Sequence, residues 1–190
     1  MKSQLINTFI AIIFTVVSVY ATSTDPSITP NGPKSFVIKH TDWSSSFVDI
    51  LITNDEGTSI YSNHQVLDRS KKYSLENLAP GNYVVSISNE IKTVKNNITI
   101  TRKGMYIDFQ ADTTYKPIFN LGENNIDVNY LSAGKDTKIY IKENQRVLYQ
   151  TNVIKKEAIN KRFDMSNLPS GDYSIVVSNK TGSYSKTFSK

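Results

Sequence analysis

The chain has 190 residues, 22 Lys and Arg against 17 Asp and Glu, a formal net charge of +5 and no cysteine. This length allows one ordinary domain or two small ones, and 21% charged with 38% hydrophobic residues excludes a disordered chain and a polytopic membrane protein. The lack of cysteine excludes disulfide frameworks, thiol catalysis, thiolate zinc sites and a lipid anchor on cysteine.

Residues 1–21 have the pattern of a secretory signal peptide. Lys2 supplies a positive charge, residues 5–19 are mostly apolar, and Val19-Tyr20-Ala21 places short side chains at the −3 and −1 positions of a cleavage site. The alternative is an uncleaved membrane anchor, although the apolar run is shorter than the ~20 residues of a spanning helix. We therefore expect export to the periplasm, the outer cell surface or the medium, with no stable membrane span after cleavage.

The segment after the signal peptide changes character at about residue 35. Residues 22–34 contain three prolines and are predicted to form a flexible lead-in. Beyond it, apolar and polar residues alternate with a period of two, as at residues 48–52 and 83–88, which is typical of half-buried antiparallel strands. No later stretch has a sustained helical period. We expect an all-β protein.

An internal repeat divides the chain. Residues 73–89 and 163–179 align without a gap at a separation of 90 residues. The identical positions are Asn77, Leu78, Gly81, Tyr83, Ser88 and Asn89 in the first copy and Asn167, Leu168, Gly171, Tyr173, Ser178 and Asn179 in the second. The upstream matches are Val37, Ile50, Ile52 and Tyr61 with Ile126, Ile139, Ile141 and Tyr149. The colinear series predicts a tandem duplication.

The turns Leu78-Ala-Pro-Gly-Asn-Tyr83 and Leu168-Pro-Ser-Gly-Asp-Tyr173 resemble the corner between the two sheets of fibronectin-III and immunoglobulin-like sandwiches. We expect each leucine to fill a core and each tyrosine to be buried, with its hydroxyl bonded to the backbone. Gly81 and Gly171 are expected at positive φ. The predicted fold is two tandem small immunoglobulin-like antiparallel β-sandwiches of six or seven strands each.

The predicted boundaries follow the repeat. The first sandwich is assigned to residues 35–112 and the second to residues 113–190. The polar segment 111–116 has no apolar period and is predicted to be the hinge between them.

The second copy is similar to the C-terminal sorting domains of the type IX secretion system of Bacteroidota. The resemblance covers residues 138–190, with a strand pair at Thr137–Lys142 and Val147–Tyr149, the Leu-Pro-x-Gly-x-Tyr turn and a last strand ending in Lys190. The same pattern resembles small secreted Bacteroidota sandwiches of unknown function. The resemblance implies a bacterial surface or extracellular protein, with residues 113–190 as an export signal.

Catalytic and metal-binding motifs are missing from the sequence. It has no nucleophile elbow, phosphate loop or paired-histidine motif, and its two histidines, His40 and His64, are not expected to act as a pair. Asp55-Glu56 is interpreted as part of a turn and not as a calcium site. We expect no enzyme activity, no cofactor and no metal.

Five residues are candidates for ligand contact. Lys71-Lys72 and Lys161-Arg162 occupy matching positions and either bind an anionic surface or protect edge strands from pairing. Trp43 lies in a predicted loop where its ring could stack on a sugar. Nucleic acid is not expected as a partner of an exported protein with this charge.

Three functions follow from these features. The first is a non-enzymatic structural or interaction protein that contacts an unidentified protein or a cell-surface glycan. The second is a type IX sorting signal in the second copy. The third is weak glycan binding.

Overall fold

The structure is a computed structural model that describes residues 26–39, 47–66 and 69–190. The described residues form strands and turns and contain no helix. The strands up to residue 116 are β1 (Ile28–Pro30), β2 (Ser35–Ile38), β3 (Val48–Asn54), β4 (Ser59–Gln65), β5 (Lys71–Ser74), β6 (Gly81–Ser88), β7 (Lys92–Ile100), β8 (Met105–Ile107) and β9 (Asp112–Tyr115). Those that follow are β10 (Ile118–Leu121), β11 (Asn125–Leu131), β12 (Thr137–Glu143), β13 (Arg146–Val153), β14 (Ala158–Asp164), β15 (Asp172–Asn179) and β16 (Gly182–Ser189).

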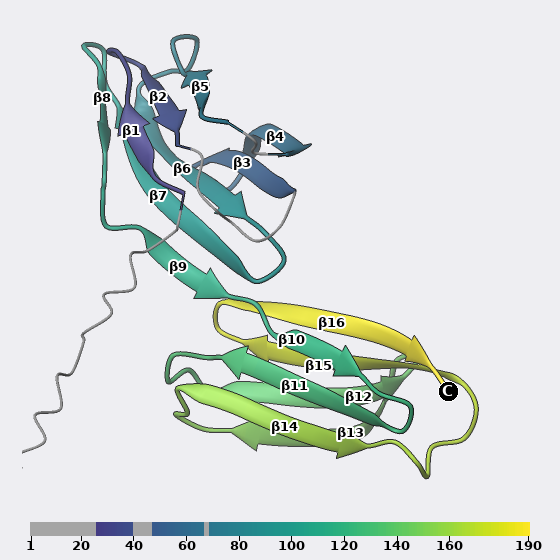
Figure 1. Cartoon of the computed structure of the whole chain (residues 1–190). Helices are drawn as coiled ribbons and strands as arrows, with labels where there is room; N and C mark the ends of the chain where they lie inside the picture. Colours follow the sequence, from purple (N-terminus) through teal and green to yellow (C-terminus); the bar gives the residue numbers. More distant parts are fainter. Residues whose placement is uncertain (1–25, 40–46, 67–68) are drawn as a thin grey trace, which may run out of the picture.

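Strands β1 to β9 form a first module of two antiparallel sheets (Figure 1). One sheet has the order β1-β2-β5, and the other has the order β4-β3-β6-β7-β8, with β9 also paired to β7. The alternation predicted from the sequence places every second residue of β3, β6 and β7 between the sheets. Phe36, Ile38, Val85 and Ile87 in this core are 0% exposed.

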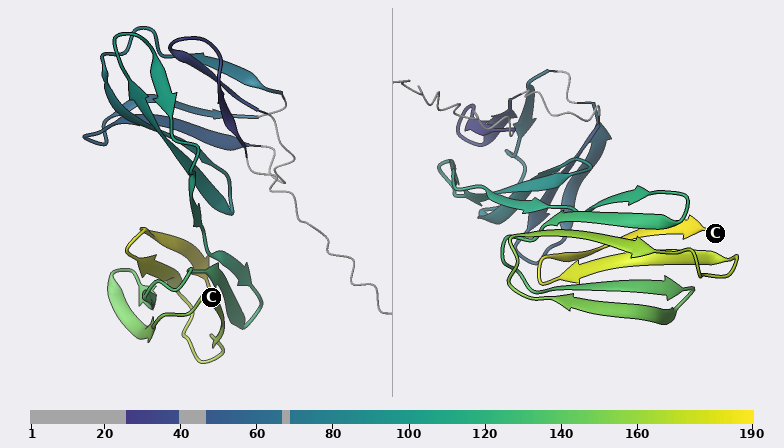
Figure 2. Two further views of the ribbon diagram at one scale, coloured as in Figure 1. Left: turned by 90° about the vertical axis from the view of Figure 1, so that its left-hand side faces the viewer. Right: turned by 60° about the horizontal axis from the view of Figure 1, so that its bottom comes forward.

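Strands β10 to β16 form a second module with the same two-sheet order but without counterparts of β8 and β9 (Figures 1 and 2). Its sheets have the orders β10-β11-β14 and β13-β12-β15-β16, and it has a separate core around Ile139 and Ile175. Among the described residues, no sheet combines strands of both modules. The chain therefore folds as two tandem immunoglobulin-like β-sandwiches, as the sequence predicted.

The two modules pair their strands in the same register. Ile52 lies opposite Tyr61 and Val85 in the first module, just as Ile141 lies opposite Tyr149 and Ile175 in the second. One upstream alignment is wrong by a residue. Phe36, and not Val37, holds the place of Ile126, because Phe36 pairs with Tyr73 and Ile126 pairs with Phe163. A shift by one residue exchanges the two faces of a strand, and only Phe36 faces the core.

The first module begins earlier than predicted. Residues 28–30 form β1, which pairs with β2, and the Ile28 side chain is 3% exposed in the core. The lead-in of 22–34 is therefore not flexible throughout. The three prolines argued against a strand. Pro30 nevertheless lies on β1, an edge strand, where a missing N–H is tolerated.

The first module also ends later than predicted. Residues 112–115 are β9, which pairs with residues 92–95 of β7, so they belong to the sheet and are not a hinge. Lys116 continues this attachment, because its backbone N–H donates to the Ile91 carbonyl and its Nζ donates to the Asn89 carbonyl at 2.5 Å. The boundary lies between Lys116 and Ile118, where β10 begins, and Figure 2 shows β9 leading from one module to the other. The sequence did not predict β9, because this strand is polar and lacks the alternation of apolar residues that marks a half-buried strand.

Candidate functional site

The predicted sheet-to-sheet corner is present in both modules. Tyr83 on β6 and Tyr173 on β15 are 8% and 2% exposed. The Tyr83 hydroxyl donates to the Ala79 carbonyl at 2.9 Å, and the Tyr173 hydroxyl donates to the Pro169 carbonyl at 2.8 Å. Each bond joins a ring in the core to the backbone of the preceding turn. These residues shape the modules and are not exposed for chemistry.

The corner leucines and glycines differ in part from expectation. Leu78 and Leu168 pack against the cores but remain half-buried. Gly81 and Gly171 do not have the positive φ predicted for them; the described glycines that do are Gly32, Gly57 and Gly134.

The space around the corner glycines does not require glycine either. A Cβ added at Gly171 would lie 3.5 Å from the Tyr173 hydroxyl oxygen, and one at Gly81 would lie 3.7 Å from the Tyr83 ring. The tyrosine therefore covers the glycine at van der Waals distance. A methyl group would therefore fit at both positions.

The two basic pairs lie on edge strands, as the interpretation that they protect such strands from pairing required. Lys71 and Lys72 belong to β5, and Lys161 and Arg162 belong to β14; each strand ends the order of a three-stranded sheet. Charged side chains on such strands oppose pairing with another chain.

The basic side chains also make contacts within their own modules. Arg162 donates to both carboxylate oxygens of Asp127 at 2.6 and 2.7 Å, which holds the pKa of Asp127 below its usual value and raises the pKa of Arg162. Lys71 donates to Gln65 Oε1 at 2.6 Å, and its Nζ lies 5.7 Å from the centre of the Tyr73 ring. The Lys71 contacts join the edge strands of the two sheets, β5 and β4.

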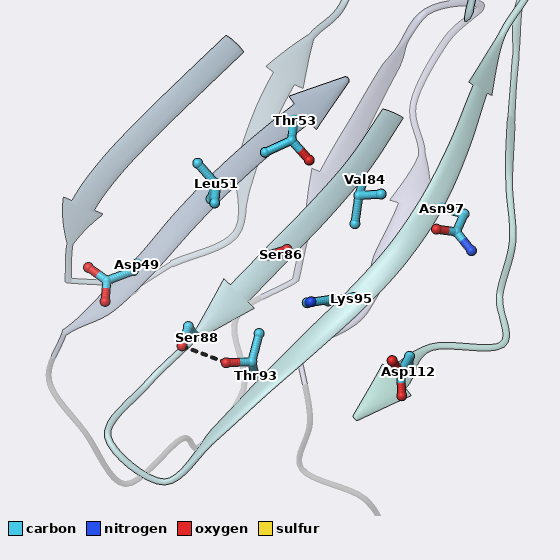
Figure 3. A pocket seen from close by; sticks show the side chains of 10 residues that line it. All are labelled: Asp49, Leu51, Thr53, Val84, Ser86, Ser88, Thr93, Lys95, Asn97 and Asp112. Carbon is cyan, nitrogen blue, oxygen red and sulfur yellow. Dashed lines mark hydrogen bonds between the residues drawn. The ribbon is translucent and has the colours of Figure 1, made fainter. Parts of the chain in front are cut away.

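A groove runs over the outer face of β3, β6 and β7, with β9 beside it (Figure 3). Its volume is about 570 Å³. Ser86, 8% exposed, forms a small floor, and Ser88 and Thr93 share a hydrogen bond of 2.8 Å. The lining residues are Asp49, Leu51, Thr53, Val84, Ser86, Ser88, Thr93, Lys95, Asn97 and Asp112. Hydroxyl, amide and charged groups can exchange hydrogen bonds with a polar ligand there.

This groove was not predicted from the sequence. Its residues are the outward-facing members of three strands, and a period-two pattern does not show which outward faces are hollow. The second module differs at the same register. Leu51 lies opposite Ser86, whereas Tyr140 lies opposite the larger Val176.

The histidines do not form a site in the described part of the chain. His64 Nδ1 lies 2.6 Å from Asp49 Oδ1, and its ring stacks on Phe47 at 5.0 Å between ring centres. His40 and Trp43 lie outside the described residues.

The described residues contain neither a cluster of metal ligands nor a membrane-crossing helix. No three His, Asp or Glu side chains there are grouped so that they could hold a metal ion. The same residues include no helix of the length and apolarity needed to cross a bilayer.

Comparison with known proteins finds a family model that matches the first module. Residues 27–101 match the family model of the secretion system C-terminal sorting domain. The resemblance inferred from the sequence is thus confirmed for the family, but the model matches the first module, whereas the motifs pointed to the second. The matched range begins beside β1 and ends just after β7.

The other comparisons are less informative. No curated protein matches the sequence. A solved structure described as "Biofilm associated protein - BSP domain" is similar over 86% of this chain, with 14% sequence identity and a TM-score of 0.29. This chain spans 28% of the length of that one.

Proposed function

We propose that the chain is an exported, non-enzymatic interaction protein whose first module carries a type IX sorting signal. The family match to residues 27–101 carries this proposal. It covers a complete series of strands from β1 to β7, including the corner at Tyr83, so the matched unit corresponds to folded structure and not to a short motif. Sorting domains direct export, which puts the protein at the cell surface or in the medium.

The second module fits the same proposal as a duplicate. Its strands repeat the register and the corner bond of the first module, which supports a tandem duplication. Residues 1–21 would act as the cleaved signal peptide for the first membrane. The sequence resemblance of residues 138–190 to sorting domains makes the second module the candidate for a second signal.

Localisation in cells tests the proposal. The full chain is produced in a Bacteroidota host and in a matched strain that lacks the type IX secretion channel, and each culture is fractionated. The expected result is surface or extracellular protein in the parent and periplasmic protein in the mutant. Equal distribution in both strains would contradict the sorting function.

Glycan binding is the second candidate, favoured by the groove of the first module. Its serine, threonine and asparagine side chains offer hydrogen bonds to sugar hydroxyls, and Leu51 and Val84 offer apolar contact. A glycan array probed with the chain and with Ser86→Val tests this, because the larger residue reproduces the second module at that position. Trp43→Ala separately tests the exposed-aromatic alternative. An unchanged glycan profile in both variants would refute glycan recognition by these residues.

A further inference from the structure

The same side of each sandwich has an edge strand that is nearly free of charge, apart from Arg146 at the start of β13, which pairs with Glu143. Strand β4 ends its sheet in the first module and β13 ends its sheet in the second. Residues 57–66 and 147–154 contain no Lys, Arg, Asp or Glu. Edge strands usually carry charged residues that prevent pairing, as β5 and β14 do here. The unpaired side of β4, and that of β13 after Arg146, lacks that protection.

A bulge exposes one aliphatic residue at the same place in both strands. The register shifts between Ile52 and Thr53 leave Ile60 without a partner on β3, and the corresponding shift leaves Leu148 without a partner on β12. Ile60 is 43% exposed and Leu148 is 37% exposed. Bulges of this kind redirect a side chain, often beside a binding site. Both modules thus present an apolar side chain from an unpaired edge.

Aromatic rings continue this surface across the opening between the two sheets. Tyr61 meets Tyr73 edge to face at 5.7 Å, and Tyr149 meets Phe163 edge to face at 5.8 Å. In the first module, the cleft between β4 and β5 has a volume of about 360 Å³, and Ile60 and Leu78 also line it. Aliphatic and aromatic side chains therefore make up most of the lining of this cleft.

Basic residues lie beside this apolar surface in both modules. Lys71 and Lys72 line the cleft of the first module. In the second, Lys161 lies on β14 two residues before Phe163, and Lys155 and Lys156 follow β13. The resulting surface is apolar in the middle and cationic at its margin, which complements a ligand with an apolar middle and an acidic end.

We propose that each module binds an extended peptide with aliphatic residues and an acidic end, which adds as a strand to β4 or to β13. An aliphatic side chain of the peptide contacts Ile60 or Leu148, and its carboxylates lie near the basic residues. The free backbone groups of the edge select a peptide over a lipid, because an acyl chain cannot form the backbone hydrogen bonds of strand addition. This inference rests on the proposed interaction role and names the class of partner.

The test uses the full chain from residue 22. Its probe is a fluorescein-labelled peptide of alternating Val and Thr that ends in a run of Asp. Binding is followed by fluorescence anisotropy, and hydrogen exchange locates the contact. The expected result is binding with slower exchange in β4 and β13. A failure to bind, or slower exchange elsewhere only, overturns the proposal.

Variants separate the two parts of the surface. Ile60→Lys combined with Leu148→Lys, and Lys72→Glu combined with Lys161→Glu, should each weaken binding by about tenfold. The matched controls are Phe109→Lys, at a residue 69% exposed elsewhere, and Lys103→Glu, and both should bind like the parent. An equal loss in the controls would overturn the proposal.

Two further probes address specificity and the link to export. The same peptide ending in Lys, and vesicles of phosphatidylglycerol, should bind at least tenfold more weakly than the acidic peptide. Preferential binding to the vesicles would show a membrane surface and overturn the peptide assignment. Export is scored separately in cells, so an exported chain that does not bind the peptide refutes this inference alone.

Discussion

The hydroxyl of Tyr83 donates a hydrogen bond of 2.9 Å to the carbonyl oxygen of Ala79, four residues earlier in the chain. The ring belongs to the core between the sheets, and the carbonyl belongs to the turn that connects them. The bond therefore fixes the direction in which β6 leaves the corner. Tyr173 and Pro169 repeat it at 2.8 Å in the second module.

Removing either corner hydroxyl should lower stability without emptying the core. We expect Tyr83→Phe and Tyr173→Phe each to reduce the free energy of unfolding by about 1 kcal/mol, because the ring stays and one hydrogen bond is lost. Urea denaturation measures this. The control is Tyr106→Phe, at a side chain 71% exposed, which should change stability by less than about 0.5 kcal/mol. A corner effect no larger than the control would contradict a structural role for the bond.

The corner leucines should contribute less than fully buried residues do. Because Leu78 and Leu168 are half-buried, we expect each Leu→Ala change to cost about 1–2 kcal/mol. Ile87→Ala, at a side chain 0% exposed, should cost about 3–4 kcal/mol in the same urea experiment. Equal losses at Leu78 and Ile87 would show that the corner is more tightly packed than its exposure indicates.

Tyr73 gives the first module a dependence on alkaline pH. Burial raises the pKa of Tyr73 to about 12 from 10.0, although the Gln65 amide donates to its hydroxyl at 2.8 Å and opposes the shift. A pKa raised on folding contributes stability that is complete below the unfolded pKa of 10.0 and is lost as the pH rises towards 12.

Tyr73→Phe isolates this effect. We expect the parent to lose roughly 2 kcal/mol more stability than Tyr73→Phe between these two pH values, as measured by urea denaturation at each pH. Parallel pH profiles for parent and variant would contradict the raised pKa.

The sequence predicted those parts of the fold that depend on alternation and turns. Period-two patterns identified β3, β6 and β15, and the repeated Leu-x-x-Gly-x-Tyr turn identified the corners. Features formed by contacts between distant strands gave no such signal. β9 is polar and pairs only because β7 extends beyond β8, and the groove over Ser86 depends on three neighbouring strands. The placement of the sorting-domain match on the first module also escaped prediction, because both modules carry the motif.

The two modules should unfold as separate units. Their cores share no strand among the described residues, so we expect fragments 26–116 and 117–190 each to show a cooperative thermal transition by circular dichroism. A fragment cut at the earlier boundary, 26–112, lacks most of β9 and the bonds of Lys116 to Asn89 and Ile91, and should melt at a lower temperature than 26–116. Two unfolded fragments would contradict independent cores.

The most direct test of the account asks which module directs export. A fluorescent reporter with the same signal peptide is fused to residues 26–116, to residues 117–190 or to both, and surface exposure is measured by protease accessibility in a type IX-competent host. The account predicts surface reporter whenever residues 26–116 are present, and loss of that exposure in a strain without the secretion channel. A reporter that stays in the periplasm with residues 26–116 but reaches the surface with residues 117–190 would contradict it.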